Sequence, residues 1–200
     1  MDDTLREGIR ERLDRFDIVE HPAGDLRRAA VCLALVADEQ GGAGVVLCRR
    51  GRVGSHQGQW GLPGGRIDAD EDAQTAALRE LAEEVGLVGG QVLGRLDDYP
   101  TRSGFHISPF VVWCPDARPA VTSPAEIRSV HHIDLGELVR PDSPRWIDIP
   151  ESDRAVLQLP IGDQLIHAPT AAVLYQFAEV ALRGRHTRVL DVEEPVFAWR

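Results

Sequence analysis

An acidic amphipathic segment at residues 72–86 constrains the fold of this chain more than any other feature. At about 100° per residue, its apolar side chains share one side of a helix and its glutamates share another. The apolar side must face a core, and Gly86 suits the position just after a helix end. The apolar set is Leu78, Leu81, Ala82 and Val85, and the acidic set is Glu80, Glu83 and Glu84.

The three glutamates need a reason to lie together, because like charges at this spacing repel by ~0.2–0.5 kcal/mol per pair. Ala76 and Ala77 lie one turn earlier on the same side, and we expect them to leave the acidic surface open. Mg²⁺ and Mn²⁺ prefer oxygen ligands and keep water molecules for substrate phosphates. A bound cation would turn the repulsion into attraction. A solvated charged face is the alternative interpretation of this stretch alone.

Composition limits the class of partner. The chain has 200 residues, which suit one domain, and a formal net charge of -10. An acidic chain does not suit a protein that follows nucleic-acid phosphates, which needs a basic face. A small anionic substrate is compatible with this charge, since a metal ion can bridge carboxylates of the protein and acidic groups of the substrate. We therefore expect a small-molecule partner and no nucleic acid.

The sequence also predicts a cytoplasmic protein that does not associate with membranes. The first residues, MDDTLREGIRERLDRF, are too charged for a signal peptide. The longest apolar run, at residues 29–37, is much shorter than the ~20 residues needed to span a bilayer. Cys32, Cys48 and Cys114 are far apart and are predicted to be buried thiols in a reducing compartment.

Hydrophobic periodicity predicts a mixture of strands and helices without regular βαβ alternation, which is typical of an α+β fold with a mixed sheet. An antiparallel strand pair is expected at 91–99 and 106–114, and the glycine-rich residues 51–70 are expected to be mostly loop. Helices are predicted over 3–16, 72–85 and 170–182, further strands over 29–37, 45–50 and 127–133, and shorter elements between 134 and 168.

A longer pattern surrounds the acidic helix. Read from Gly65, it runs Gly, five residues, Glu71, seven residues, Arg79-Glu80-Leu81, one residue, Glu83-Glu84, one residue, Gly86-Leu87. This pattern resembles the Nudix hydrolase signature at every fixed position. The resemblance implies a loop–helix–loop catalytic element on an α/β/α sandwich with a mixed sheet. It also implies Mg²⁺- or Mn²⁺-dependent cleavage of nucleoside diphosphates linked to another moiety.

The resemblance assigns roles residue by residue. Glu80 and Glu84 would be the main metal ligands, and Glu83 a further ligand or the base that activates water. The carbonyl of Gly65 would complete the coordination sphere. Glu71 and Arg79 would form an ion pair that fixes the loop against the helix. Glu126, which follows a loop, is an alternative base or ligand, and a surface acid is its simpler interpretation.

A second resemblance concerns the substrate. Residues 46–65, VLCRRGRVGSHQGQWGLPGG, resemble the segment that precedes the signature in coenzyme A diphosphatases. This resemblance implies hydrolysis of coenzyme A or acyl-CoA to 3′,5′-ADP and a phosphopantetheine. Alternatives are a diphosphatase for ADP-ribose, NADH or another dinucleotide, and a non-catalytic nucleotide-binding regulatory module. The positions that match this pattern are Arg49, Gly58, Pro63, Gly64 and Gly65, and His56 and Gln59 also stand where such proteins often carry these residues. The positions that depart from it are Cys48, Arg50, Gly54 and Leu62.

Several side chains are candidate substrate contacts, each with a structural alternative. Arg49 is expected to grip a phosphate as a bidentate donor or to form a salt bridge at a strand end. His56 is expected to contact phosphate or the leaving group, or to make a structural hydrogen bond. Trp60 would stack on adenine or pack in the core. The remaining candidates are Gly64 in the Gly-Gly turn and Arg102, Ser103 and Phe105 in a strand connection.

We expect three parts along the chain: a helical extension at 1–28, a Nudix hydrolase domain at 29–182, and a tail at 183–200 that packs on the domain. The apolar tail and the N-terminal helix could together form a homodimer interface, which is a further expectation.

Overall fold

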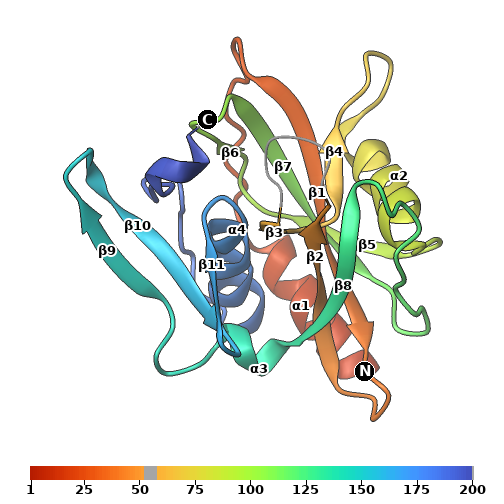
Figure 1. The fold of residues 1–200 in the computed structure, drawn as a ribbon. Coiled ribbons are helices and arrows are strands. Elements are labelled where there is room, and N and C mark those ends of the chain that lie inside the picture. Colours follow the sequence, from red (N-terminus) through yellow and green to blue (C-terminus); the bar gives the residue numbers. More distant parts are fainter. Residues whose placement is uncertain (52–57, 200) are drawn as a thin grey trace.

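The apolar run near the start of the chain forms β1 (Arg27–Ala37), the central strand of a mixed eight-stranded sheet. The computed structural model describes residues 1–51 and 58–199 (Figure 1). β1 pairs antiparallel with β2 (Ala43–Arg50) and parallel with β7 (Phe105–Trp113). Side chains alternate along β1, so that Cys32 and Ala34 face one layer of the core and Leu33 and Leu35 face the other.

The large sheet has the strand order β3-β2-β1-β7-β5, with β4 beside β1, β6 beside β7 and β8 beside β2. Both expected strands of the antiparallel pair are present, although the first one stops early and resumes as a separate short strand. The remaining strands are β3 (Trp60–Gly61), β4 (Gly64–Arg66), β5 (Gln91–Arg95), β6 (Tyr99–Pro100) and β8 (Ile127–Asp134).

Helices cover both faces of this sheet. α2 (Ala73–Val85) packs on one face, and α1 (Asp3–Asp14) and α4 (Thr170–Phe177) pack on the other (Figure 1). The predicted α+β fold and α/β/α layering are therefore confirmed. The last predicted helix continues as a π-helix, η1 (Ala178–Leu182), in which the buried carboxylate of Glu179 binds arginines downstream.

A smaller sheet packs against α4. It has the order β11-β10-β9 and is made of β9 (Arg145–Ile149), β10 (Ser152–Ile161) and β11 (Gln164–His167). β9 and the paired part of β10 extend away from the body as an arm (Figure 1). A four-residue helix, α3 (Leu135–Leu138), joins β8 to this sheet. The short elements predicted between 134 and 168 are confirmed, although β10 is a strand of 10 residues.

Both ends of the chain are anchored to the body. α1 packs in the same core layer as α4, and the C-terminal segment contains a short 3-10 helix, η2 (Val196–Ala198). The Tyr99 hydroxyl donates to the carbonyl of Val192, 2.9 Å away, which ties this segment to β6. The division of the chain into an extension, a domain and a tail, with boundaries at 28/29 and 182/183, stays a prediction.

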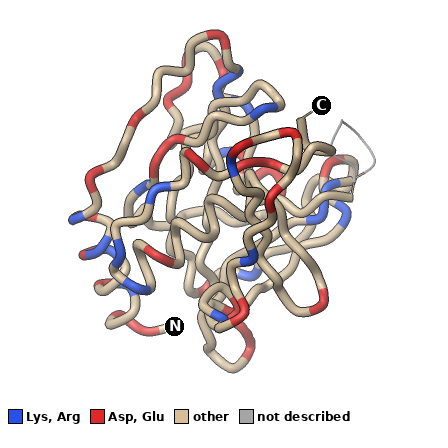
Figure 2. The backbone as a smooth tube through the Cα atoms, turned by 90° about the vertical axis from the view of Figure 1, so that its left-hand side faces the viewer, with Lys and Arg blue, Asp and Glu red and all other residues tan. Residues whose placement is uncertain are grey.

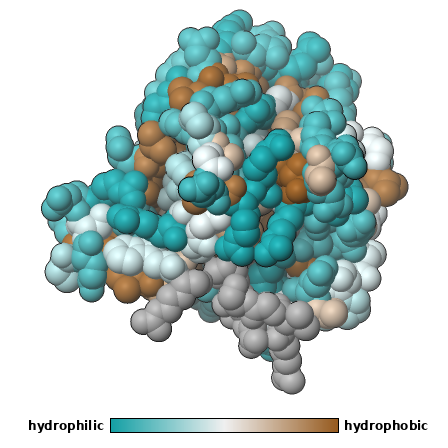
Figure 3. Space-filling view, turned by 90° about the horizontal axis from the view of Figure 1, so that it is seen from above, coloured by the Kyte–Doolittle hydropathy of each residue, from teal (hydrophilic) through white to brown (hydrophobic). Residues whose placement is uncertain are grey.

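Acidic and basic positions are both spread over the molecule (Figure 2). Its upper face is mostly hydrophilic with scattered apolar patches (Figure 3). Within the described residues, no helix is long and apolar enough to cross a bilayer. All three cysteines are buried free thiols, as predicted, and burial raises the pKa of Cys48 to about 12.

The region predicted to be mostly loop contains a strand that depends on one glycine. Gly64 opens β4 with φ 152°, and a Cβ there would lie 2.3 Å from the carbonyl oxygen of Ala30 and 2.7 Å from the Cα of Val31. Backbone atoms cannot move aside as a side chain can. The Gly-Gly turn can therefore approach β1 only because position 64 lacks a side chain.

Replacing Gly64 by alanine should lower the free energy of unfolding by about 3 kcal/mol or more, because strain and a backbone clash combine. Urea denaturation measures this change. Gly8→Ala is the matched control, since Gly8 lies within α1 with open space around it, and it should stabilise the protein by about 0.5–1 kcal/mol. Equal effects of the two substitutions would contradict this account of β4.

Candidate active site

α2 is fixed at both ends by hydrogen bonds. Asp72 caps its start by accepting from the backbone N–H of Thr75 at 2.9 Å. Gly86 ends it in the left-handed conformation with φ 70°, as predicted from sequence. The backbone N–H of Thr122 donates to the carbonyl of Glu84, so the connection between β7 and β8 holds the last turn. The helix can therefore position its acids accurately.

The orientation of α2 differs from the helical projection. Ala76 and Ala77 are fully buried against the sheet, so the prediction that they border an open acidic surface is wrong. Their small size lets the helix lie close to β1, where the Cys32 thiol reaches the carbonyl of Ala77 at 3.2 Å. Because α2 is turned about its axis relative to the projection, the side chain of Glu84 also points inward.

Glu84 is the most enclosed of the three glutamates, with 2% of its surface exposed. One carboxylate oxygen accepts from the Arg50 guanidinium at 2.6 Å, and the other accepts from the backbone N–H of Gly64 at 2.9 Å. Burial raises the pKa of Glu84, and Arg50 opposes that shift. Glu84 thus joins the end of β2, the Gly-Gly turn and α2 at one point.

Glu80 and Glu83 lie in more open surroundings. The Glu80 side chain is 16% exposed and packs on the Gly-Gly turn, where a Cβ at Gly65 would lie 2.3 Å from its carboxylate. The Glu83 side chain is 58% exposed. The three acids therefore occupy three environments: a buried one, one cradled by a glycine, and one at the surface.

Arg79 connects the loop to these acids. It makes two hydrogen bonds of 3.0 Å to Glu71, which confirms that they pair, and a third to the carbonyl of Arg66. The bond from Arg79 lowers the pKa of Glu71. Arg79 also contacts Glu80 at 2.8 Å and Glu83 at 3.2 Å. The long side chain of Arg79 therefore reaches the acidic side of α2 as well as the preceding loop.

The donors present suit a hard divalent cation in their chemistry. Carboxylate oxygens of Glu80 and Glu84 both border the Gly-Gly turn, and the missing Cβ of Gly65 leaves room at Glu80. Within residues 1–51 and 58–199, no three acidic, histidine or cysteine side chains are gathered tightly enough to form a complete metal cage. Arg50 pairs with Glu84 instead, and Arg79 pairs with Glu80.

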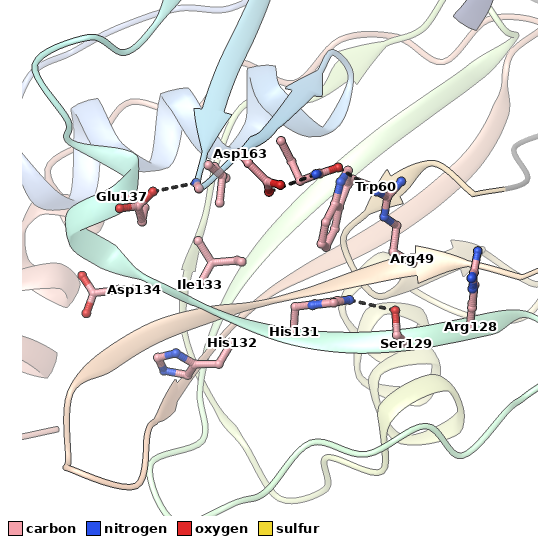
Figure 4. A pocket seen from close by; sticks show the side chains of 13 residues that line it. Arg49, Trp60, Arg128, Ser129, His131, His132, Ile133, Asp134, Glu137 and Asp163 are labelled. Carbon is pink, nitrogen blue, oxygen red and sulfur yellow. Dashed lines mark hydrogen bonds between the residues drawn. The ribbon is translucent and has the colours of Figure 1, made fainter.

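A pocket of about 660 Å³ lies on the other side of β2 from Glu84 (Figure 4). β8 forms its floor, and the turn between β10 and β11 forms one wall. Arg49, Arg128 and Ser129 lie at one end, and Asp134 and Glu137 lie at the other (Figure 4). The pocket therefore has a cationic end and an acidic end.

Arg49 and Trp60 lie together in this pocket. The Arg49 guanidinium stacks 4.5 Å from the centre of the Trp60 ring and donates to the side chain of Gln164 at 2.8 Å. The ring of His131 packs edge-on against Trp60, and burial and Arg49 lower the pKa of this histidine. His132 points to the opposite side of β8 (Figure 4), as expected for neighbours in a strand.

The other candidate contacts lie elsewhere. Phe105 stacks under Arg27 at 4.0 Å, and the Ser103 hydroxyl bonds to Thr101. None of Arg102, Ser103 and Phe105 lines the pocket of Arg49. His56 lies outside the described residues. Glu126 is exposed and accepts a hydrogen bond from Ser123.

Arg102 binds buried acids of the C-terminal segment. Its guanidinium binds Glu193 at 2.8 Å and stacks 5.1 Å from the Trp199 ring, and its backbone N–H donates to Glu194. Glu194 is 1% exposed, and among the described atoms its second carboxylate oxygen has no hydrogen-bond partner. Burial raises the pKa of Glu194 to about 7.

Sequence reasoning missed two residues that organise these sites. Arg50 was noted only as a departure from the coenzyme A diphosphatase pattern, yet it is the ionic partner of Glu84. Strand alternation indicates that Arg49 and Arg50 face opposite sides, which is a usable signal. Gln164 carries no local signal, because its contact with Arg49 joins strands far apart in the chain.

Comparisons with known proteins agree with this geometry. A family model described as NUDIX domain matches residues 26–152. The Uncharacterized Nudix hydrolase NudL of Yersinia enterocolitica is 29% identical over 181 residues, covering 86% of this chain and 92% of that protein. A Salmonella newport protein of the same name is 31% identical over 146 residues, covering 69% and 75%. A crystal structure of a MutT/nudix family protein from Enterococcus faecalis has a TM-score of 0.59 at 14% identity, covering 92% of this chain and 75% of that one, which shows a shared fold.

Gly65→Ala tests the cradle for Glu80. The new Cβ would displace the end of a flexible side chain, so the free energy of unfolding should change by less than about 1 kcal/mol. Displacing the carboxylate should weaken binding of Mn²⁺ by about tenfold or more, as measured by isothermal titration calorimetry. Unchanged Mn²⁺ affinity would show that the position of Glu80 is irrelevant to the cation.

Glu194 predicts a pH dependence of stability. Its folded pKa of about 7 exceeds the ordinary value of 4.5, so the folded state binds the proton more tightly than the unfolded state. Its contribution to stability is therefore present below pH 4.5 and is lost as the pH rises to about 7, by up to about 3 kcal/mol.

Denaturation of the wild type and Glu194→Gln from pH 4.5 to pH 8 measures this loss. The variant should gain stability relative to the wild type as the pH rises. Glu151→Gln, at an exposed turn, should follow the wild type throughout. Parallel curves for Glu194→Gln and the wild type would refute the shift.

Proposed function

This chain belongs to the Nudix hydrolase family, and on that premise we propose that it hydrolyses the diphosphate bond of a nucleoside diphosphate derivative with Mg²⁺ or Mn²⁺. The observation that carries the proposal is the meeting of Glu80, Glu84 and the Gly64–Gly65 turn at one side of α2. The Glu71–Arg79 ion pair holds the preceding loop against that helix.

Glu80, Glu84, Glu83 and the carbonyl of Gly65 are the residues proposed to hold the metal. A bound divalent cation supplies neutralisation of the phosphate oxygens and a more acidic water molecule. The chain contributes orientation, because α2 is capped at both ends and its acids sit at fixed positions on it. The acids differ in burial, and we assign Glu84, which is the most buried of them and is held by two hydrogen bonds, as the most firmly fixed ligand.

We assign the proton-accepting role to Glu83, with Glu126 as the alternative. Glu83 is exposed and is held only by Arg79 among the described side chains, so it can reach a water molecule at the surface of the site. The water oxygen bonds to phosphorus, the bridging P–O bond breaks, and the base takes the proton of the water. Both products then carry a terminal phosphate, and no protein nucleophile is needed.

Coenzyme A or acyl-CoA is the proposed substrate, with 3′,5′-ADP and a phosphopantetheine as products. Support comes from the pattern at residues 46–65, with its departures at Cys48, Arg50, Gly54 and Leu62. The pocket of Arg49 is proposed to receive one half of the substrate. Its cationic end suits phosphate, and its apolar lining, which includes Ile133 and Ile161, suits an organic moiety.

ADP-ribose, NADH and other dinucleotides are the alternative substrates for the same site. A nucleotide-binding regulatory module is the alternative to an enzyme. Every acid of the signature is present in this chain, which favours catalysis over binding alone. The substrates are distinguished by incubating the protein and Mg²⁺ or Mn²⁺ with each compound and resolving the products by mass spectrometry. Faster cleavage of ADP-ribose or NADH would overturn the proposal that coenzyme A is the substrate. Saturable nucleotide binding without cleavage would favour the regulatory module.

Glu84→Gln should lower kcat by about 10²–10⁴-fold, because it removes a charged ligand from the metal site. Glutamine has nearly the same size, but its amide nitrogen cannot accept, so one of the two bonds to Arg50 and Gly64 is lost. Circular dichroism checks that the variant is folded. Glu11→Gln, a partly exposed position on α1, is the control and should leave kcat unchanged. Wild-type turnover by Glu84→Gln would refute the proposed centre.

A further inference from the structure

β2 ends in two adjacent arginines that point to opposite faces of the sheet. Arg49 reaches the pocket, where it binds Gln164 and stacks on Trp60. Arg50 reaches the other face, where it binds Glu84. The same residue type therefore serves two different sites one position apart. The role of Arg50 is not explained by substrate binding in that pocket.

Arg50 closes a compact ring of hydrogen bonds at Glu84. Its guanidinium donates to Glu84 at 2.6 Å and to the carbonyl of Gly64 at 3.1 Å, and the N–H of Gly64 donates to Glu84 at 2.9 Å. Gly61 in the neighbouring strand makes room for it, because a Cβ there would lie 3.3 Å from the Arg50 Nε. The end of β2, the Gly-Gly turn and α2 therefore all take part in this ring of hydrogen bonds.

Arg50 makes a buried charge tolerable. An ionised carboxylate that is 2% exposed is costly unless a countercharge and hydrogen bonds satisfy it. Arg50 supplies that countercharge, and its own side chain is only 29% exposed. A divalent cation would supply the same countercharge to the same carboxylate. The two cations would repel each other across Glu84, so each weakens the binding of the other.

Arg50 is better able to leave than the other arginine of the site. Arg79 also binds a proposed ligand, Glu80, but it is anchored independently by two bonds to Glu71 and one to Arg66. Within the described part of the chain, the Arg50 side chain donates only to Glu84 and to Gly64. Both of its partners thus belong to the place where the cation would bind.

We propose that Arg50 is an internal counter-ion of Glu84 that a divalent cation must displace in order to bind at that carboxylate. This inference rests on the metal site of the proposed function, but not on its substrate or its turnover. Arg50 then sets the metal affinity of the chain at a lower value than the acids alone would give. The guanidinium is exchanged for the metal when the site is loaded.

Isothermal titration calorimetry with Mn²⁺ tests the proposal in four proteins. Arg50→Gln should bind Mn²⁺ about tenfold more tightly than the wild type, because the competing charge is gone. Arg50→Lys keeps the charge and should stay within about threefold of the wild type. Arg49→Gln removes the adjacent arginine, on the other face of β2, and should leave the Mn²⁺ affinity unchanged. Equal or weaker binding by Arg50→Gln would overturn the proposal, since Arg50 would then support the metal site.

A measurement on the wild type covers the case in which Arg50→Gln does not fold. The Nη1–H resonance of Arg50, whose hydrogen is donated to Glu84, can be followed by ¹⁵N NMR at low temperature while Mg²⁺ is added. Displacement predicts that this resonance shifts and that its hydrogen exchanges faster with water as the site fills. The Arg79 resonance should keep its protection, because the bonds to Glu71 persist. A protected, unshifted Arg50 resonance at saturating Mg²⁺ would overturn the proposal.

These experiments separate failure of the inference from failure of the proposed function. If no protein in the series binds Mn²⁺, the metal site itself is wrong and the inference falls with it. If all bind with equal affinity, the metal site stands and the inference alone is refuted. If Arg50→Gln binds more tightly, the inference holds whatever the substrate.

Discussion

The buried carboxylate of Glu84 is the interaction on which the rest of this site depends. It accepts from Gly64 in the turn and from Arg50 at the end of β2, and it projects from α2. Three segments that are separate in the sequence therefore share one acid. The turn can reach that acid only because Gly64 lies against the backbone of β1 without a side chain. Loop, strand and helix are thus held by a polar contact inside an otherwise apolar layer.

Much of this arrangement could be predicted from local sequence signals. The apolar run at 29–37 predicted a strand, and Gly86 predicted the end of α2 because glycine readily adopts that left-handed conformation. The resemblance to the Nudix signature also implied the Glu71–Arg79 pair. These features depend on residues close together in the chain, where local signals carry most information.

The missed features depend on which surfaces come together. The helical projection grouped Ala76 and Ala77 with the acids, but it could not tell that small residues would be used to bring α2 close to β1. The Arg49–Gln164 contact joins strands of two different sheets. Arg102 looked like a substrate residue in a connecting loop, yet it is paired with Glu193 from the other end of the chain. Periodicity carries no information about such distant partners.

The opposed arginines of β2 have a consequence for how this protein can change over time. Side chains alternate along a strand, so insertion or deletion of one residue in β2 would turn Arg49 and Arg50 each to the opposite face of the sheet. The length of the strand is therefore under a double constraint. The identity of the two side chains is not, because the side chain at position 49 lies on the pocket face and the one at position 50 lies on the face of α2. The proposed substrate pocket and the proposed cation site can consequently change by independent point substitutions, provided that the register between them is kept.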